Sequence, residues 1–199
     1  GAPLVPAFHR AQFATPGVAT AIVNIGGIAN VSAVSAEGSV TGWDTGPGNT
    51  LMDAWIAGHQ AAAFDQAGAW AATGAVIPDL LEGLLKAPYF GRAAPKSTGP
   101  EAFHLEWLGT FLSGGESSVD VQRTLLELTV ESIAHALKTS SPATVRICGG
   151  GANNTFLMAR LSERLSPANV TTTEAVGIPP SWVEAAAFAW LAAQTVAGD

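Results

Sequence analysis

Two β-branched apolar runs joined by a pair of glycines constrain the fold of this chain more than any other feature. The runs cover residues 19–25 and 28–34, and Gly26-Gly27 lies between them. Glycine adopts the positive φ angles that tight reverse turns require, so the pattern predicts a β-hairpin. Glu37-Gly38 then predicts a turn into a third strand over 39–43. The start of the chain is therefore expected to form an antiparallel β-meander.

The rest of the chain alternates predicted helices with two more short strands. The stretch 44–49, rich in turn-forming residues, is expected to end the third strand. Helices are predicted over 51–60, 67–72, 78–85, 105–112, 119–137 and 153–165, with a last helix after the prolines at 179–180. Short strands are predicted over 145–148 and 170–173, and the helix between them predicts parallel pairing through a right-handed crossover.

The predicted fold class is α/β, with a β-meander followed by helices and then α-β-α-β-α. One domain is expected over residues 1–199, and the proline- and glycine-rich loop 88–100 is its only soft boundary. With 48% hydrophobic residues, the chain is long enough for a sizeable core and too apolar for disorder.

Composition excludes several classes of function. Nine Lys+Arg against 16 Asp+Glu give a net charge of −7, which argues against nucleic-acid binding. No run of about 18 apolar residues predicts a membrane span. The single cysteine, Cys148, excludes an intramolecular disulfide and favours a reducing, cytoplasmic location. The four histidines are not spaced as metal ligands, so no metal cluster is predicted.

Gly149-Gly150-Gly151 directly follow a predicted buried strand and lead into a helix. Ligands bind at the carboxyl ends of such strands, and three consecutive glycines exceed what a turn requires. We therefore expect a flat ligand such as a nucleoside to lie there on bare backbone, with a simple tight turn as the alternative. A Walker A loop is excluded because no Lys-Ser/Thr pair follows, and the Rossmann spacing does not fit. The Gly26-Gly27 turn could similarly cradle a phosphate oxygen, although a plain hairpin turn is the better explanation of a Gly-Gly pair taken alone.

Two acidic residues are candidates for ligand contacts. Asp44-Thr45-Gly46 is the triplet of aspartic proteases, but that chemistry needs a second triplet, which the chain lacks. Asp44 is expected either to contact a ligand hydroxyl or to hold its loop. Glu184 either binds a sugar hydroxyl beside Trp182 or is a solvated residue at a helix start. Lys96 is expected to be an exposed loop lysine unless it contacts a phosphate or sugar.

Together these segments resemble the family of anhydro-N-acetylmuramic acid kinases. The matching stretches follow the family's order: 1–6 with 8–9, 24–30, 42–49 with 51–55, 68–70, 95–99, 121–122 with 125–128, 148–153, and 177–184 with 187–190. The resemblance implies the C-terminal lobe of an actin-like ATPase (ribonuclease H-like) fold, with ATP held between two lobes and the N-terminal lobe absent from this chain.

The implied reaction is an ATP-dependent, Mg²⁺-assisted kinase step in peptidoglycan recycling. It opens the 1,6-anhydro ring of anhydro-N-acetylmuramic acid with water and phosphorylates O6, which gives N-acetylmuramate 6-phosphate and ADP. The catalytic aspartate is expected upstream of Gly1, so residues 1–199 alone are expected to be inactive. A homodimer is also expected, because a divided kinase would expose apolar surface. The alternative is a non-catalytic module that binds a nucleotide or a muramyl sugar.

The resemblance also implies roles for individual residues. Those expected at the ATP phosphates are Gly26, Gly27 and Asn30. Those expected at the adenosine are Gly149, Gly150, Gly151 and Asn153. Those expected at the sugar are Glu184, Asp44 and Asn49. Asn24 stands where many members of the wider superfamily carry an aspartate near Mg²⁺.

Overall fold

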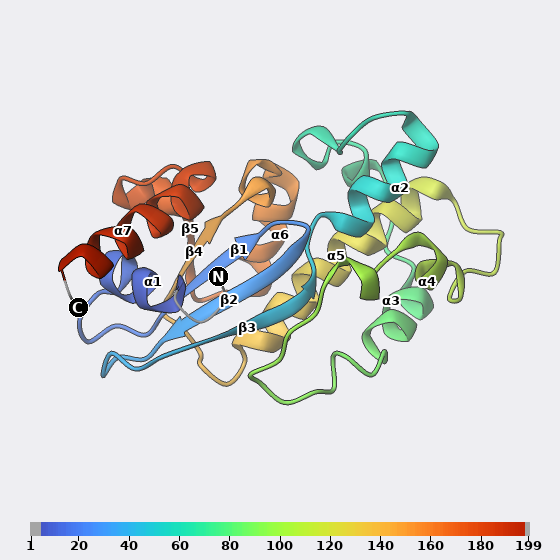
Figure 1. Cartoon of the computed structure of the whole chain (residues 1–199). Helices are drawn as coiled ribbons and strands as arrows, with labels where there is room; N and C mark the ends of the chain where they lie inside the picture. Colours follow the sequence, from blue (N-terminus) through green and yellow to red (C-terminus); the bar gives the residue numbers. More distant parts are fainter. Residues whose placement is uncertain (1–4, 198–199) are drawn as a thin grey trace.

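The computed structural model describes residues 5–197, so the family-like stretch at residues 1–4 lies outside the described part. A five-stranded sheet runs through the middle of these residues, with the order β3-β2-β1-β4-β5 (Figure 1). Its strands are β1 (Thr20–Ile25), β2 (Ile28–Val34), β3 (Val40–Pro47), β4 (Thr144–Cys148) and β5 (Asn169–Thr172). The pairs β1–β2 and β2–β3 are antiparallel, which confirms the predicted meander. The predicted parallel pair β4–β5 is confirmed as well, and β1 also pairs in parallel with β4.

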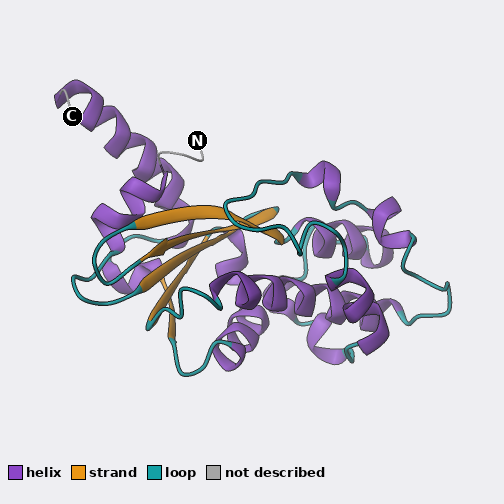
Figure 2. Ribbon diagram, turned by 90° about the horizontal axis from the view of Figure 1, so that it is seen from below, coloured by secondary structure: helices purple, strands orange, loops and turns teal. Residues whose placement is uncertain are grey.

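Helices cover both faces of this sheet (Figure 2). The helices are α1 (Val5–Phe13), α2 (Thr50–Gln60), α3 (Pro78–Leu85), α4 (Leu105–Gly109), α5 (Ser118–Leu137), α6 (Thr155–Arg164) and α7 (Val183–Ala197). The core consists of two apolar clusters, one on each face of the sheet, because successive side chains of a strand such as β1 point to opposite faces. Ala21, Val23 and Ile25 join the larger apolar cluster around α5. Ile22 joins a smaller cluster with residues of α1 and α7.

The third strand is longer than predicted, because the turn-forming residues after position 43 stay paired with β2. Thr45 donates its hydroxyl to the Ala29 carbonyl oxygen at 3.3 Å, and Pro47 stands opposite Ile28. An irregularity at Ala29–Asn30 absorbs the change of register. Pairing with a neighbouring strand therefore outweighs the local preference for a turn.

Helical predictions fail where side chains bind the backbone locally. The helix predicted over 67–72 is wrong: the chain forms two short 3₁₀ turns, η1 (Gln66–Gly68) and η2 (Ala71–Thr73). The Asp65 carboxylate accepts the N–H groups of Trp70 and Ala71, each at 2.9 Å, which draws the chain into a tight loop. The helix predicted over 153–165 is confirmed as α6, which follows the 3₁₀ turn η4 (Gly150–Asn153) and is capped by the Asn154 side chain.

Helix α1 was not predicted, because nine residues that begin beside prolines give little periodic signal. Shorter 3₁₀ turns, η3 (Pro100–Ala102), η5 (Thr173–Val176) and η6 (Pro180–Trp182), join the longer elements. The loop 88–100 packs onto β3, where Tyr89 and Phe90 are buried and the Asp44 N–H donates to the Lys96 carbonyl oxygen at 3.0 Å. None of the helices between residues 5 and 197 has the length and apolar character needed to cross a membrane.

Candidate functional site

Four of the five strands end at one edge of the sheet, and two of them bring the two glycine-rich segments together there. β1, β4 and β5 are parallel and β3 runs in the same direction, so their carboxyl ends lie at this edge. The Gly26-Gly27 turn follows β1, and Gly149-Gly150-Gly151 follow β4 (Figure 1). Carboxyl ends of strands are where α/β proteins bind ligands.

The hairpin turn is held in place by its carbonyl groups rather than by its amides. The carbonyl oxygen of Gly27 accepts the N–H of Gly48 at 2.8 Å, and that of Gly26 accepts the N–H of Asn49 at 2.8 Å. The Asn49 side chain also donates to the Ile25 carbonyl oxygen at 3.1 Å. Within residues 5–197, no backbone hydrogen bond uses the N–H of Gly26 or Gly27 as its donor. These two amides can therefore bind an anion.

Gly149 can only be glycine in this structure. Its φ of +79° and ψ of −180° fall in a region that side chains exclude. A Cβ there would also overlap the Asn24 side-chain oxygen and approach the Ile25 carbonyl oxygen to 2.8 Å. Gly151 is buried, and a Cβ on it would overlap the Ile25 side chain. These two glycines let η4 pack tightly on the end of β1, and they leave Gly150 exposed between them.

A row of polar side chains crosses the sheet beside these glycines. Asn24 stands opposite Asn30 on β2, which stands opposite Asp44 on β3, and Asn24 is also paired with Cys148 on β4. Directly opposite residues share a face of the sheet, so this row lies on the side covered by α1 and α7. The fold thus brings together Asn24 and Cys148, which are 124 positions apart in the sequence.

A cleft of about 680 Å³, here called the main cleft, opens over this row. The predicted site residues that line it are Gly26, Gly27, Asn30, Asp44, Gly149, Gly150 and Glu184. A smaller cleft of about 260 Å³ is lined by the other predicted residues Asn49 and Asn153, and again by Gly150. Gly150 therefore lies at the boundary of both clefts, whereas Gly151 lines neither. Asp53 also lines the smaller cleft, and burial raises the pKa of its carboxyl to about 6.

Asp44 contacts the loop 88–100, whereas the sequence predicted that it would contact a ligand hydroxyl or hold its own loop. Its carboxylate accepts the Thr98 N–H at 2.9 Å, and its carbonyl oxygen accepts the Tyr89 hydroxyl at 2.7 Å. Lys96 is not the exposed loop lysine expected by default. It is half-buried and lines a different cavity, because its ammonium group turns back onto the carbonyl oxygens of Tyr89 and Phe90.

Glu184 projects from the first turn of α7 into the main cleft and remains exposed. It lies near enough to Cys148 to affect the thiol: burial, and secondarily the Glu184 carboxylate, raise the pKa of Cys148 to about 12. A buried thiol with that pKa is not a nucleophile. Phe188, rather than Trp182, provides the aromatic ring beside this carboxylate.

Sequence reasoning missed His9, which also lines the main cleft. Its ring is only 1% exposed, and Nδ1 lies 2.9 Å from the Ser32 hydroxyl on β2. Burial lowers the pKa of His9 to about 4, so the imidazole is neutral near pH 7. The only sequence signal for it was a histidine beside Phe8 in an otherwise apolar stretch. The described residues contain no group of three or more His, Cys, Asp or Glu side chains that could hold a metal ion.

The sheet order, the glycine turn after β1 and the glycine loop after β4 define the class of this protein: a lobe of the actin-like ATPase fold. A solved structure, the activator of the 2-hydroxyisocaproyl-CoA dehydratase from Clostridium difficile with bound ADPNP, matches with a TM-score of 0.56. The match covers 92% of this chain and 62% of that chain at 12% identity, so it shows the fold alone. The predicted fold class is confirmed.

Sequence comparison gives the family within this class. The model of the family described as Anhydro-N-acetylmuramic acid kinase matches residues 1–198, and the chain belongs to this family. Curated relatives of that name include one from Nitrosospira multiformis, 50% identical over 200 residues, and one from Pseudomonas paraeruginosa, 52% identical over 196 residues. These matches cover 100% and 96% of this chain but only 55% and 54% of the relatives. The chain spans about half the length of the curated relatives it matches.

Proposed function

We propose that this chain is the nucleotide-binding lobe of a kinase that acts on 1,6-anhydro-N-acetylmuramic acid. The observation that carries the proposal is the position of Gly150, which lines both clefts within reach of the Gly26-Gly27 turn. One elongated ligand can therefore lie along the sheet edge, with its two ends in different clefts. ATP has this shape, and the relatives are named as kinases of this sugar.

The residues present fit ATP. The smaller cleft offers amide and carboxyl groups for an adenosine at Asn49, Asp53 and Asn153. The N–H groups of Gly26 and Gly27 donate to no backbone carbonyl within residues 5–197 and suit the phosphates, because backbone amides at a turn bind anions without a net positive charge. We accordingly place Asn49 on the nucleotide side rather than at the sugar. Gly151 lines neither cleft, and its close packing against Ile25 holds the loop that contains Gly149 and Gly150 on the end of β1.

Mg²⁺ is part of the same proposal. Mg²⁺ keeps several waters and binds through one or two carboxylates and the phosphates of the substrate, so a dedicated cluster is not required. Asp44 and the side-chain oxygens of Asn24 and Asn30 form the polar row next to the phosphate position. When bound, the ion would neutralise charge on the transferred phosphoryl group.

We place the sugar in the part of the main cleft near α7. Glu184 offers a carboxylate for sugar hydroxyls, and Phe188 offers an apolar face for the ring. In the proposed reaction, water adds to C1, the bond from C1 to O6 breaks, and O6 receives the γ-phosphoryl group of ATP. The base that takes the proton from water is expected upstream of Gly1, so the residues of this chain bind and orient the reactants.

An ADP-release assay with 1,6-anhydro-N-acetylmuramic acid tests the proposal. The protein encoded by the complete gene is expected to release ADP and form N-acetylmuramate 6-phosphate, identified by mass spectrometry, while residues 1–199 alone are expected to be silent. Glu184→Gln is expected to raise the KM for the sugar with little change in the KM for ATP. Glu106→Gln, at an exposed position outside both clefts, is the matched control and is expected to leave both constants unchanged.

Two results would change the proposal. Sugar-dependent turnover by residues 1–199 would show that the base lies within this chain. A folded complete protein that binds ATP or the sugar but releases no ADP would support the alternative, a non-catalytic binding module.

A further inference from the structure

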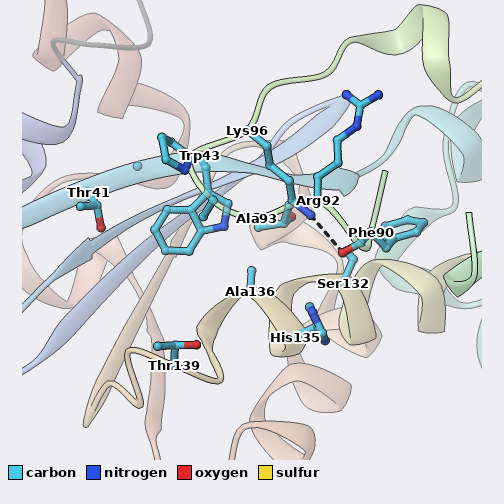
Figure 3. A pocket seen from close by; sticks show the side chains of 14 residues that line it. Thr41, Trp43, Phe90, Arg92, Ala93, Lys96, Ser132, His135, Ala136 and Thr139 are labelled. Carbon is cyan, nitrogen blue, oxygen red and sulfur yellow. Dashed lines mark hydrogen bonds between the residues drawn. The ribbon is translucent and has the colours of Figure 1, made fainter. Parts of the chain in front are cut away.

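A second cavity, of about 620 Å³, lies on the other side of β3 from the Asp44 carboxylate and shares the lining residues Gly42 and Trp43 with the main cleft. It is enclosed by β3, the loop 88–100 and the second half of α5 (Figure 3), and is here called the α5 cavity. Thr41, Trp43 and Thr45 line it from β3. The alternation of β3 sends Asp44 to the other face, so this carboxylate belongs to the main cleft.

The α5 cavity has an unusual charge for this protein. The chain holds 16 acidic residues and nine lysines and arginines, yet no Asp or Glu lines the cavity, whereas Lys96 and Arg92 do. Figure 3 shows the Lys96 side chain reaching down toward α5, while the Arg92 guanidinium extends away from it. The positive charge inside the cavity is therefore mainly that of Lys96.

Lys96 has a charge that no carboxylate of the described residues neutralises. Its ammonium group donates to the carbonyl oxygens of Tyr89 and Phe90 at 3.1 and 3.3 Å and lies 4.5 Å from the centre of the Tyr89 ring. The ion pairs between described residues do not include Lys96. Burial, and secondarily Arg92, lower the pKa of Lys96 below its usual value. Two of its three N–H groups are used, so one donor and the charge remain for a ligand.

The other walls suit a planar apolar group. Trp43 is half-buried, and its indole ring lines the cavity (Figure 3). Phe90 and Ala136 add apolar surface on the far side of the cavity (Figure 3). The Ser132 hydroxyl donates to the Thr129 carbonyl oxygen at 3.0 Å and so can accept a hydrogen bond from a ligand. A charge, a ring and a few polar groups are the composition of a small-molecule site.

We propose that the α5 cavity binds a small aromatic anion, a carboxylate or a phosphate monoester, with its charge at Lys96 and its ring against Trp43. An anion is selected because the cavity has positive charge without a counter-charge, and an aromatic group is selected because the indole face is the largest flat apolar surface in it. This site uses neither glycine turn and stands apart from the proposed kinase function.

Calorimetric titration of the protein encoded by the complete gene tests this site, with phenyl phosphate as the probe. Benzyl alcohol and inorganic phosphate separate the contributions of the ring and the charge, and both are expected to bind more weakly. Lys96→Met is expected to weaken phenyl phosphate binding roughly 10- to 100-fold, the usual effect of losing a hydrogen bond to a charged group. Lys86→Met removes the same charge at an exposed ion pair with Glu82 and is expected to change nothing.

A second variant keeps the test valid if Lys96→Met unfolds the protein. Ala136→Leu adds volume inside the cavity without touching Lys96 and is expected to abolish binding while a circular dichroism melt shows a folded protein. The proposal is overturned if the unaltered protein does not bind phenyl phosphate at millimolar concentration. It is equally overturned if Ala136→Leu binds as tightly as the unaltered protein, or if an excess of ATP displaces the probe.

Discussion

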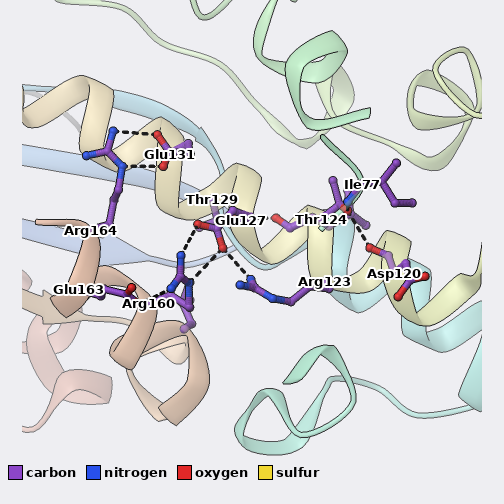
Figure 4. A network of polar contacts seen from close by, with 12 residues as sticks. Ile77, Asp120, Arg123, Thr124, Glu127, Thr129, Glu131, Arg160, Glu163 and Arg164 are labelled. Carbon is purple, nitrogen blue, oxygen red and sulfur yellow. Dashed lines mark hydrogen bonds and ion pairs between the residues drawn. The ribbon is translucent and has the colours of Figure 1, made fainter. Parts of the chain in front are cut away.

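Replacing Glu127 by glutamine is expected to destabilise the protein more than any other conservative change in its charged side chains. Glu127 lies on α5 with its side chain 7% exposed and contacts two arginines (Figure 4). Arg123 donates to it at 2.6 Å from the same helix, and Arg160 donates to both carboxylate oxygens at 3.1 and 3.2 Å from α6. Glutamine has the same size but no charge, so two cations would lose their shared partner.

The expected cost follows from the burial of these groups. Removing one partner of a buried ion pair costs about 3–5 kcal/mol, because the remaining charge is left without compensation. Because the Arg160 side chain is 25% exposed, water can partly solvate its charge, and the expected loss of unfolding free energy lies at the lower end of this range, about 3 kcal/mol. For a chain of this length that corresponds to a fall in Tm of about 6–12 °C.

The effect is expected to depend on pH. Burial alone would raise the pKa of Glu127, but hydrogen bonds from Arg160 and Arg123 outweigh it and hold the pKa below its usual value. A carboxyl with a lowered folded-state pKa stabilises the protein above its unfolded pKa, and this contribution disappears as the pH falls through the folded value. The difference between the unaltered protein and Glu127→Gln is therefore largest near neutral pH and shrinks below about pH 4.5.

Urea and thermal denaturation at pH 7 and pH 4 measure this difference. Glu163→Gln is the matched control: Glu163 also pairs with Arg160, but its side chain is 71% exposed, so its loss is expected to cost at most about 1 kcal/mol. A Glu127→Gln protein as stable as the control, or a loss that is the same at both pH values, would refute the reasoning.

Two further predictions concern the site. Gly149→Ala is expected to destabilise the protein by about 1–3 kcal/mol and to abolish ATP binding measured by calorimetry, because the methyl group would occupy the space of Asn24 and Ile25. Gly115→Ala is the control and is expected to be neutral, because a Cβ at that position meets open space. Burial lowers the pKa of His9 from 6.5 to about 4, so the unfolded chain binds a proton that the folded protein does not, and stability is expected to fall as the pH drops from 6.5 to 4. His9→Leu is expected to flatten this part of a plot of Tm against pH, and an unchanged slope would contradict the prediction.

Much of the fold could be predicted because hydrophobic patterns within short stretches of the sequence indicate its strands and helices. The hairpin at Gly26-Gly27 and helix α5 follow from alternation and from helical periodicity, and both agree with the prediction to within one or two residues. The errors occur where a distant or lateral contact outweighs local preference. Pairing with β2 extends β3 through turn-forming residues, and the Asp65 carboxylate replaces a predicted helix by two 3₁₀ turns.

The candidate site was predicted residue by residue, but its arrangement was not. Both glycine segments were expected from the resemblance to bind a ligand, and residues of both line the main cleft. His9 gave almost no signal, because a buried neutral histidine looks like any other histidine in a short stretch. The α5 cavity gave none, since it forms only where the loop 88–100 folds back over β3 and α5.

The sequence by itself determined the α/β class, the β-meander, the position of the glycine turns and the family, because each depends on residues close together along the chain. Only the tertiary structure decided which residues share a cleft. The polar row from Asp44 through Asn30 and Asn24 to Cys148 exists because strand pairing sets these residues opposite one another. The same pairing turns neighbouring residues of β3 to opposite faces, so that Asp44 lines the main cleft whereas Thr45 lines the α5 cavity.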